Sequence, residues 1–294
     1  MTDRIPQSHA DGILLGLIGA PIRHSASPAM HEAAAAAVGL RGCYRLIEVA
    51  DADTPHLNAM LDGIRLLGFS GVNVTYPYKE AVLPLLDDVD AEAAAIGAVN
   101  TVTVREKRLT GHNTDATGFA RACRDVVGSV AGQTVCLVGA GGAGKAIAFA
   151  LAGMGVARLA IHDRDAAKAG ALARALEGRV TAVACATPAD GLAGANGLVN
   201  ATPVGMLPSR DTPVPPHLLR RDLWVADAVY WPLWTPLLQA ARETGAKVMT
   251  GRELAIHQAL DAFKLFTGLS APREAMSTAF DAVIAARGAM PREA

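Results

Sequence analysis

Short apolar runs alternate along the chain with segments whose apolar residues recur at helical spacing. In the first part of the chain this alternation is typical of β-α-β units and predicts a parallel or mostly parallel sheet. Thr54 is expected to cap the second helix, with Pro55 at its first position. The expected strands and helices are, in order, Ile13–Ile18, Pro28–Val38, Cys43–Val49, Pro55–Leu67 and Val72–Val74.

A second alternation of the same kind begins near Gln133, and the last segment changes character. After Gly251, the residues Ile256, Leu260 and Phe263 recur at helical spacing until Gly268, which predicts a helix that need not belong to the second sheet. The expected strands and helices before it are Thr134–Val138, Gly142–Met154, Ala157–Ile161, Ala166–Leu176, Gly197–Val199, Leu223–Ala226 and Lys247–Met249.

Composition narrows the class of protein. The 294 residues suggest about two domains, and 51% hydrophobic residues argue against wholesale disorder. With 27 basic and 28 acidic residues there is no basic field for a nucleic acid. The uncharged stretches Val126–Gly144 and Gly191–Ser209 are broken by turn-forming and polar residues, so no membrane span is expected. Since the start of the chain also lacks an apolar signal segment, we expect a cytoplasmic protein.

The cysteines and histidines give no sign of a metal site. Four cysteines are far apart and lack metal-binding spacing, so we expect reduced thiols and no metal. Four histidines near polar motifs are expected to pack or to support their neighbours rather than carry protons. They are His24, His31, His112 and His257.

A glycine-rich motif follows the first strand of the second alternation and opens a helix. Gly139 permits a tight turn, Gly141 lets backbone amides approach a pyrophosphate, and Gly144 lets the helix pack close to the strand. The start of the helix adds positive partial charge for phosphates. The motif predicts a dinucleotide site, the alternative being a glycine turn without a ligand. It reads Gly139-Ala140-Gly141-Gly142-Ala143-Gly144.

The residues after the next strand bear on the choice of dinucleotide. Asp163 is placed to accept hydrogen bonds from the ribose hydroxyls and would repel a 2′-phosphate, which favours NAD. Arg164 could instead pair with that phosphate, so NADP stays open. In a further alternative Asp163 caps the following helix, a role that Asp165 can also fill.

Several polar motifs precede the glycine motif. Gly19–Pro28 carries Ser25 and Ser27 into a helix, where they could cap it or hold a carboxylate. Gly71–Glu80 presents the polar side chains of Asn73, Thr75 and Lys79 near the end of a strand. The motifs Gly97–Thr101 and Gly111–Asp115 follow it. With these motifs the chain resembles the shikimate and quinate dehydrogenase family over nearly its whole length. The resemblance rests on Asn73, Thr75 and Lys79, on Gly97–Thr101 and Gly111–Asp115, on Asn200–Met206, on Tyr230 and on Gly251–Gln258.

The resemblance implies a fold and a set of site residues. The fold would be an N-terminal α/β substrate-binding domain, residues 1–116 with 252–294, and a C-terminal Rossmann-type NAD(P)-binding domain, residues 117–251, with the last helices returning to the first domain. The catalytic pair would be Lys79 and Asp115. Substrate-binding residues would be Ser25, Ser27, Asn73, Thr75, Asn100, Tyr230 and Gln258. Cofactor-binding residues would be Gly139, Ala140, Gly141, Gly142, Ala143, Asp163, Arg164, Asn200, Ala201, Thr202, Val229 and Gly251.

The chain departs from the family pattern at two places. Many NADP-using relatives carry Asn-Arg-Thr or Asn-Arg-Ser where this chain has Asp163-Arg164-Asp165, which strengthens the case for NAD. The Asn that is common before the family's Pro-Ile pair is Ala20, and we expect little consequence because the backbone turn can be kept without it.

The expected activity is a reversible NAD(P)-dependent oxidation of shikimate to 3-dehydroshikimate, of quinate, or of both. Lys79 would take the hydroxyl proton during oxidation and return it during reduction, and Asp115 would hydrogen-bond the reacting hydroxyl. Serine at both Ser25 and Ser27 looks more like members that use shikimate well. Two alternatives are a non-catalytic NAD-binding sensor of the same fold and a dehydrogenase of another ring acid such as aminoshikimate. The partner would be the small-molecule substrate, and a homodimer stays open.

Overall fold

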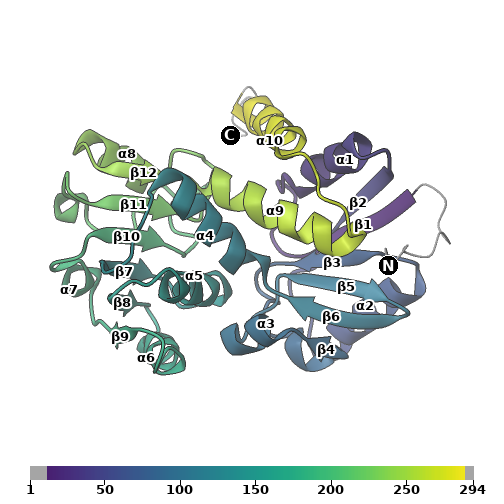
Figure 1. The fold of residues 1–294 in the computed structure, drawn as a ribbon, viewed down its shortest axis with the longest axis horizontal. Helices are drawn as coiled ribbons and strands as arrows, with labels where there is room; N and C mark the ends of the chain where they lie inside the picture. Colours follow the sequence, from purple (N-terminus) through teal and green to yellow (C-terminus); the bar gives the residue numbers. More distant parts are fainter. Residues whose placement is uncertain (1–11, 289–294) are drawn as a thin grey trace. The chain divides into compact units, whose positions relative to one another are not determined.

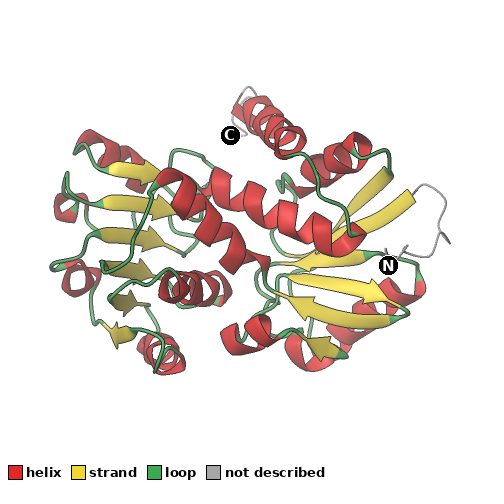
Figure 2. Cartoon of the chain, in the orientation of Figure 1, coloured by secondary structure: helices red, strands yellow, loops and turns green. Residues whose placement is uncertain are grey.

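A computed structural model describes residues 12–288 and confirms the α/β fold class (Figures 1 and 2). The chain divides into two compact units. The first contains the chain up to Asp90, Val99–His112 and the chain from Ala259 on, and the second contains Ala91–Ala98 and Asn113–Gln258. The domain ranges expected from the sequence, 1–116 with 252–294 and 117–251, share this discontinuity but differ in their boundaries, and they stay a prediction.

The first unit is built on a mixed six-stranded sheet with the order β2-β1-β3-β5-β6-β4. β1 pairs in parallel with β2 and β3, and β4 pairs in parallel with β6, whereas β5 runs antiparallel to both of its neighbours. The elements are β1 (Gly12–Gly19), α1 (Ser27–Ala37), β2 (Arg41–Glu48), α2 (Thr54–Leu66), β3 (Gly71–Val74), η1 (Leu83–Leu85), β4 (Asp88–Val89), β5 (Thr101–Arg105), β6 (Arg108–His112), the end of α9 (Gly251–Thr267) and α10 (Arg273–Gly288).

The antiparallel hairpin of β5 and β6 was not expected from the sequence. Its two-residue loop consists of Glu106 and Lys107, which both have positive φ, 49° and 62°. Hairpins of this length usually carry Asn or Gly there, so the usual turn signal is missing from the sequence. The hairpin places Thr101 opposite His112.

The start of α2 corrects one expectation. Asp53, not Thr54, is the N-cap, because its side chain accepts a hydrogen bond from the backbone N–H of His56 at 3.0 Å. Pro55 lies in the first turn as expected. Asp and Thr are both good N-cap residues, and the sequence places them side by side.

The core of the first unit joins β1 and β2 to the end of α9. Leu15 and Leu17 of β1 pack with Tyr44 of β2 and with Phe266 of α9. His31 of α1 stacks on the Tyr44 ring, with the ring centroids 4.9 Å apart. These contacts pack β1 and β2 against α1 and the end of α9.

The second unit has a parallel six-stranded sheet with the order β12-β11-β10-β7-β8-β9, the strand order of a doubly wound Rossmann fold. Its elements are α3 (Ala91–Ile96), α4 (Thr114–Val126), β7 (Thr134–Val138), α5 (Gly142–Gly153), β8 (Arg158–His162), α6 (Ala166–Ala175), β9 (Thr181–Ala184), α7 (Pro188–Leu192), β10 (Gly197–Asn200), η2 (Pro216–Leu218), β11 (Trp224–Asp227), α8 (Pro236–Glu243), β12 (Lys247–Met249) and the start of α9.

Both faces of this sheet are buried. Along β7, Val135 and Leu137 pack into a core with residues of α4, α5 and α6. The alternate residues Cys136 and Val138 pack into a second core with residues of α7 and α8. Since successive side chains of a strand point to opposite faces, helices must cover the sheet on both sides. Ligands of such sheets bind at the carboxyl ends of the strands.

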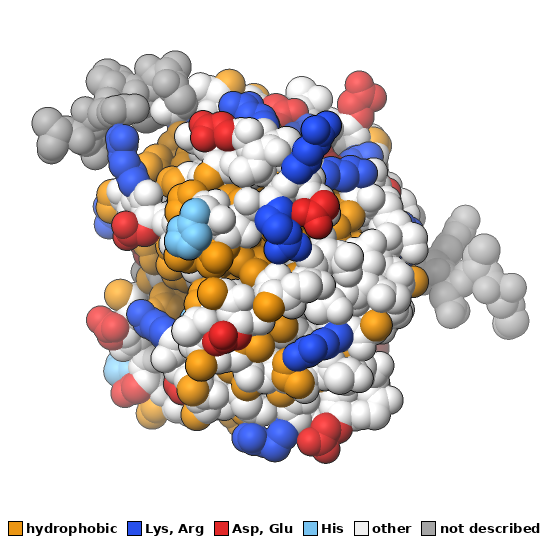
Figure 3. Space-filling view, turned by 90° about the vertical axis from the view of Figure 1, so that its left-hand side faces the viewer, with side chains coloured by type: hydrophobic (Ala, Val, Ile, Leu, Met, Phe, Trp, Pro, Cys, Tyr) orange, Lys and Arg blue, Asp and Glu red, His pale blue; other side chains and the backbone are white. Residues whose placement is uncertain are grey.

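The surface carries charges of both signs. On the face drawn in Figure 3, Lys and Arg side chains are scattered among Asp and Glu side chains and form no basic patch. Within residues 12–288, none of the helices combines the length and the apolar character that crossing a membrane requires.

Candidate active site

In the first unit, two polar loops meet at the carboxyl ends of β1 and β3. The Ala20 N–H donates to the carbonyl of Tyr76 at 3.0 Å, which ties the serine loop to the loop that carries Thr75 and Lys79. Ser25 Oγ accepts the backbone N–H of Ser27 at 3.2 Å and lies 3.0 Å from its Oγ. The N-cap of α1 is Ala26, without a side-chain cap. The two hydroxyls therefore lie together at the start of α1, where a carboxylate is favoured.

The loop that carries Lys79 is anchored at both of its sides. The Lys79 carbonyl accepts the N–H of Val99 at 2.8 Å. The hydroxyl of Tyr78 lies 2.8 Å from the carbonyl oxygen of Val49 and accepts the N–H of Ala52 at 2.9 Å. Tyr78 is buried and Lys79 is half-buried. The backbone under Lys79 is thus fixed on one side by a buried ring and on the other by the chain leading into β5.

A chain of neutral polar side chains runs from β2 to Asn100. The Tyr44 hydroxyl donates to Asn73 Oδ1 at 2.9 Å. Asn73 Nδ2 donates to Thr101 Oγ1 at 3.0 Å and to the carbonyl of Asn100 at 3.2 Å. The Thr101 hydroxyl donates to Asn100 Oδ1 at 3.0 Å, so the Asn100 amide has its oxygen on the Thr101 side and its NH₂ group on the other. We call Tyr44, Asn73, Thr101 and Asn100 the amide relay.

In the second unit, Asp115 and Gln258 come from two helices in contact. Asn113 caps α4 by accepting the N–H groups of Asp115 and Ala116 at 3.1 and 3.3 Å. A Cβ atom at Gly118 would lie 2.8 Å from the backbone nitrogen of Gln258, so glycine is needed for α9 to approach α4 this closely. Asp115 lies one turn before Gly118 on the same side of α4. Asp115 is buried and Gln258 is half-buried.

The glycine loop has the geometry that a dinucleotide requires. Gly139 has φ +104°, and a Cβ there would lie 2.9 Å from the backbone carbon of Ala201. A Cβ at Gly144 would collide with the Gly139 carbonyl, so this glycine allows α5 to pack against the strand end. A Cβ at Gly141 would meet no atom within 4 Å, which leaves room beside the backbone at the start of α5. These positions fit a pyrophosphate held by backbone amides.

Asp163 lies at the carboxyl end of β8 and touches the glycine loop directly. Its Oδ2 accepts the N–H of Ala140 at 2.7 Å, and its Oδ1 accepts the N–H of Asp165 at 2.9 Å. The alternative in which Asp163 caps α6 is wrong, because Asp165 is the N-cap and accepts the N–H of Ala167 at 3.0 Å. Arg164 is exposed between the two carboxylates. Each carboxylate oxygen of Asp163 keeps capacity for a further hydrogen bond.

The turn after β10 is held by Asp227, a residue to which the sequence motifs gave no role. Asn200 Nδ2 donates to Asp227 Oδ1 at 2.9 Å, and Asn200 Oδ1 accepts the N–H of Thr202 at 3.0 Å. Asp227 also accepts the N–H of Val229 at 2.9 Å. A Cβ at Gly251 would lie 2.6 Å from the Val229 carbonyl oxygen, so α9 starts directly against Val229.

Within each unit, some of the expected site residues contact one another, whereas pairings between residues of different units stay predictions. In the first unit it joins Ser25 to Ser27, and Asn73 to Asn100. In the second it joins Asp163 and Ala201 to the glycine loop, and Val229 to Gly251. Lys79 belongs to the first unit and Asp115 to the second, so their pairing stays a prediction, as do the roles of the half-buried Thr75 and Tyr230.

Three residues with polar roles were missed, Tyr44, Thr101 and Asp227. For Asp227 a signal was present, because a carboxylate stands at the end of the expected strand Leu223–Ala226, the position at which parallel sheets bind ligands. Thr101 stands inside the Gly97–Thr101 motif but was given no role there, and Tyr44 lies outside every motif. Their contacts to Asn73 could not be expected from the sequence, because Tyr44 lies 29 residues and Thr101 28 residues away from it.

Of the histidines and cysteines, His31 and His257 make packing or supporting contacts and Cys123 and Cys136 are buried, whereas His24 and Cys43 are exposed. His31 is 1% exposed, its ring nitrogens have no hydrogen-bond partner, and burial lowers its pKa to about 3. His257 Nε2 lies 3.0 Å from Asp125. The cysteines are free thiols, and burial raises the pKa of Cys136 to about 12. Within the part of the chain that the structure describes, no group of three or more His, Cys, Asp or Glu side chains could hold a metal ion.

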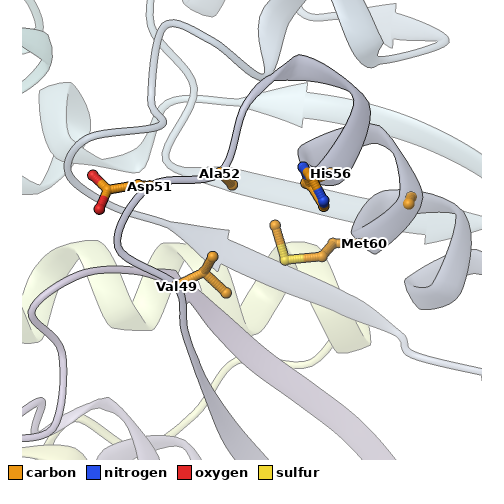
Figure 4. A pocket seen from close by; sticks show the side chains of 6 residues that line it. Val49, Asp51, Ala52, His56 and Met60 are labelled. Carbon is orange, nitrogen blue, oxygen red and sulfur yellow. The ribbon is translucent and has the colours of Figure 1, made fainter.

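An open hollow lies between the end of β2 and α2 (Figure 4). It contains none of the site residues expected from the sequence. Its polar side chains are Asp51 and His56, and the His56 ring already bonds the N-cap Asp53 at 2.6 Å. The lining residues are Val49, Asp51, Ala52, His56, Ala59 and Met60.

Comparison with known proteins identifies the family. Residues 17–102 match the family described as shikimate dehydrogenase substrate binding domain, and residues 121–203 match shikimate / quinate 5-dehydrogenase. A quinate/shikimate dehydrogenase (NAD(+)) of Corynebacterium efficiens is 46% identical over 92% of this chain and 98% of its own length. A shikimate dehydrogenase (NADP(+)) of an Arthrobacter species is 40% identical over 95% and 98%.

Solved structures agree with these matches. The quinate dehydrogenase of Corynebacterium glutamicum, in complex with NAD, superposes with a TM-score of 0.85 at 44% identity, covering 92% of this chain and 99% of that one. The shikimate 5-dehydrogenase of Thermus thermophilus, in complex with NADP(H) and shikimate, gives 0.83 at 39% identity, covering 92% and 99%. By its sequence, its two matched family regions and its fold, this chain belongs to the shikimate and quinate dehydrogenase family.

Proposed function

We propose that this protein oxidises shikimate to 3-dehydroshikimate, reversibly and with NAD as the preferred cofactor, and that quinate is a second substrate. The observation that carries the choice of NAD is Asp163. Its carboxylate is fixed at the end of β8 against the Ala140 amide, the place at which ribose hydroxyls are bound in Rossmann folds. A 2′-phosphate there would meet the negative charges of Asp163 and Asp165.

The relatives support the same preference. Two of the relatives named above, both from Corynebacterium, have NAD in their names or titles, and they are 46% and 44% identical to this chain. The two relatives with NADP in their names or titles are 40% and 39% identical to it. The Asn-Arg-Thr or Asn-Arg-Ser expected of many NADP-using relatives is Asp163-Arg164-Asp165 here. Arg164 alone would have to offset two neighbouring carboxylates to hold a 2′-phosphate.

The proposed roles divide between binding and proton transfer. Ser25 and Ser27, together at the start of α1, would hold the substrate carboxylate. Lys79 would accept the hydroxyl proton during oxidation and return it during reduction, and Asp115 would hydrogen-bond the same hydroxyl. When bound, the nicotinamide accepts or returns the hydride. Ring hydroxyls would be bound by Thr75, Asn100, Tyr230 and Gln258.

Asn73 takes a supporting role in this proposal. Both of its amide hydrogens are directed to Thr101 Oγ1 and the Asn100 carbonyl, which leaves its Nδ2 group no hydrogen for a substrate. We therefore place Asn73 as the residue that holds Asn100 in position. Cofactor contacts would come from the glycine loop Gly139–Ala143, from Asp163 and Arg164, from the Asn200–Thr202 turn, from Val229 and from Gly251.

The experiment is a matrix of reactions with the purified full-length protein. NAD or NADP is mixed with shikimate, quinate or an aminated shikimate analogue, and reduced nicotinamide is followed by absorbance. We expect the nicotinamide cofactor to be reduced when shikimate or quinate is present, with a higher kcat/KM for NAD than for NADP. Reduction only with the aminated analogue would assign the protein to another ring acid. Nicotinamide binding without turnover of any acid would make it a sensor.

A further inference from the structure

Asp227 is a buried carboxylate to which neither the sequence motifs nor the proposed reaction gives a role. It lies at the carboxyl end of β11 and is 1% exposed. Its Oδ1 accepts hydrogen bonds from Asn200 Nδ2 and from the Val229 N–H, each at 2.9 Å. Its Oδ2 accepts the Thr235 hydroxyl at 2.7 Å. Hydrogen bonds to a charged acceptor are among the stronger ones in proteins.

The three donors belong to three different segments. Asn200 ends β10, Val229 follows β11, and Thr235 is the N-cap of α8. The Thr235 Oγ1 also accepts the N–H of Leu238 at 3.3 Å, so one hydroxyl connects the helix start to the carboxylate. Asp227 therefore links the ends of two neighbouring parallel strands to the helix that follows them.

The segments that Asp227 holds are also those expected to line the cofactor path. Asn200 Oδ1 accepts both the N–H and the hydroxyl of Thr202, at 3.0 and 2.6 Å, which shapes the Asn200–Thr202 turn. This turn packs against Gly139 of the glycine loop, and the Val229 carbonyl packs against Gly251 at the start of α9. A change at Asp227 would thus reach the glycine loop through Asn200 and α9 through Val229.

We infer that Asp227 is a positioning residue for the dinucleotide, holding the Asn200–Thr202 turn and Val229 in the places from which they contact it. This inference rests on the proposed use of a nicotinamide cofactor. A carboxylate suits the task because it accepts all three hydrogen bonds and donates none. An amide at the same place would present an NH₂ group to at least one donor.

The energetic cost of this arrangement argues for a role beyond packing. Burial raises the pKa of Asp227 to about 6, against the lowering effect of its three hydrogen bonds. A buried charge is retained only where its partners compensate for lost water. The neighbouring positions Val225 and Ala226 of the same strand are filled by apolar side chains that carry no such cost.

The main test is Asp227→Asn in the full-length protein. We expect the dissociation constant of NAD, measured by calorimetry without substrate, and the KM for NAD to rise about tenfold, while the KM for shikimate stays within twofold. The matched control is Asp222→Asn, the same change at an exposed carboxylate just before β11, which should leave both constants unchanged. An unchanged affinity for NAD in a folded Asp227→Asn protein would overturn the inference.

A second pair of variants serves if Asp227→Asn does not fold. Thr235→Val keeps the shape of the side chain but removes the hydrogen donated to Oδ2, and Thr235→Ser retains it. NAD affinity should fall severalfold in Thr235→Val and return in Thr235→Ser. Equal losses in NAD and shikimate affinity, or no loss, would contradict a cofactor-specific role. If the wild-type protein itself binds no nicotinamide dinucleotide, the proposed function fails. If the wild-type protein binds NAD and the variants bind it equally well, only the inference about Asp227 fails.

Discussion

The two units hold their polar groups at strand ends by different chemistry. In the first unit the amide relay of Tyr44, Asn73, Thr101 and Asn100 consists of hydroxyl and amide groups that carry no charge. In the second unit, carboxylates do the same work, since Asp163 holds the glycine loop and Asp227 holds the turn after β10. Both arrangements fix a loop that the sequence motifs had marked as a ligand contact.

The difference has consequences for charge and for pH. In the proposed function the first unit receives an anionic ring acid, and a neutral relay adds no negative charge to the strand ends that carry Ser25, Ser27 and Lys79. In the second unit the carboxylates are directed at backbone and side-chain donors, which offsets their charge. We therefore expect effects of pH on the supporting networks to arise from the second unit, at Asp227, rather than from the amide relay.

The largest effect should come from Lys79, the residue proposed to transfer the proton, rather than from either network. In Lys79→Ala we expect kcat to fall about 10³-fold, because general acid–base catalysis contributes roughly 10²–10⁴-fold. Shikimate should still bind, as measured by calorimetry, because Ser25 and Ser27 remain. The exposed Lys264→Ala is the control in the same unit and should retain wild-type kcat. A Lys79→Ala enzyme within a few-fold of wild type would remove Lys79 from proton transfer.

The next effect concerns stability and pH, and it distinguishes the charged network from the neutral one. The pKa of Asp227 is raised to about 6 by burial, above its unfolded value, so the folded state binds the proton more tightly. Proton binding by Asp227 therefore stabilises the folded state by about 3 kcal/mol below about pH 4. This stabilisation is lost as pH rises through about 6.

The measurement for this prediction is thermal or urea unfolding of wild type and Asp227→Asn between pH 4 and 7. The stability of wild type relative to the variant should decline as pH rises across this range. A variant of the amide relay, Tyr44→Phe, should show a constant difference from wild type over the same range. A pH-independent difference for Asp227→Asn would contradict the raised pKa.

A smaller effect, about tenfold, is expected on the choice of cofactor. Asp163→Ala removes the carboxylate that would repel a 2′-phosphate, so the ratio of kcat/KM for NAD to that for NADP should fall. The ratio is the readout because loss of the bond to the Ala140 amide can lower activity with both cofactors. Asp165→Ser keeps the cap of α6 and removes only the neighbouring charge, so it should lower the ratio less than Asp163→Ala does. An unchanged ratio in Asp163→Ala would sink the assignment of Asp163.

The smallest effect is expected in the amide relay itself. Thr101→Val keeps the shape of this fully buried side chain but removes its hydroxyl from between Asn73 and Asn100. We expect the KM for shikimate to rise about fivefold while the KM for NAD is unchanged, and Thr101→Ser to restore it. The opposite pattern, in which NAD binding suffers instead, would erase the distinction between the two networks.

The sequence predicted the parallel framework better than the hairpin and the caps. The strands and helices around the glycine loop follow clear periodicity, and the motif defines the turn between them. The hairpin at Glu106 and Lys107 was missed because neither residue signals a positive φ. The cap of α2 was misplaced by one residue because Asp53 and Thr54 both suit the role, and only the backbone geometry decides between them.

The candidate site was predicted where motifs are contiguous and missed where partners are distant. Ser25, Lys79 and the glycine loop stand inside recognisable motifs. Tyr44 and Asp227 act through side chains on other strands, and their contacts depend on strand order and register, which a single sequence does not contain. Asp227 could still have been considered, because a carboxylate ends a buried strand beside the expected ligand edge.

The hydride transfer itself can be followed with an isotope. Shikimate carrying deuterium at the carbon whose hydroxyl is oxidised is incubated with the wild-type protein and NAD, and the reduced cofactor is analysed by mass spectrometry. We predict reduced NAD that is heavier by one deuterium, formed together with 3-dehydroshikimate. Bound but unreduced NAD, or reduced NAD without the label, would contradict the assignment of this protein as a shikimate dehydrogenase.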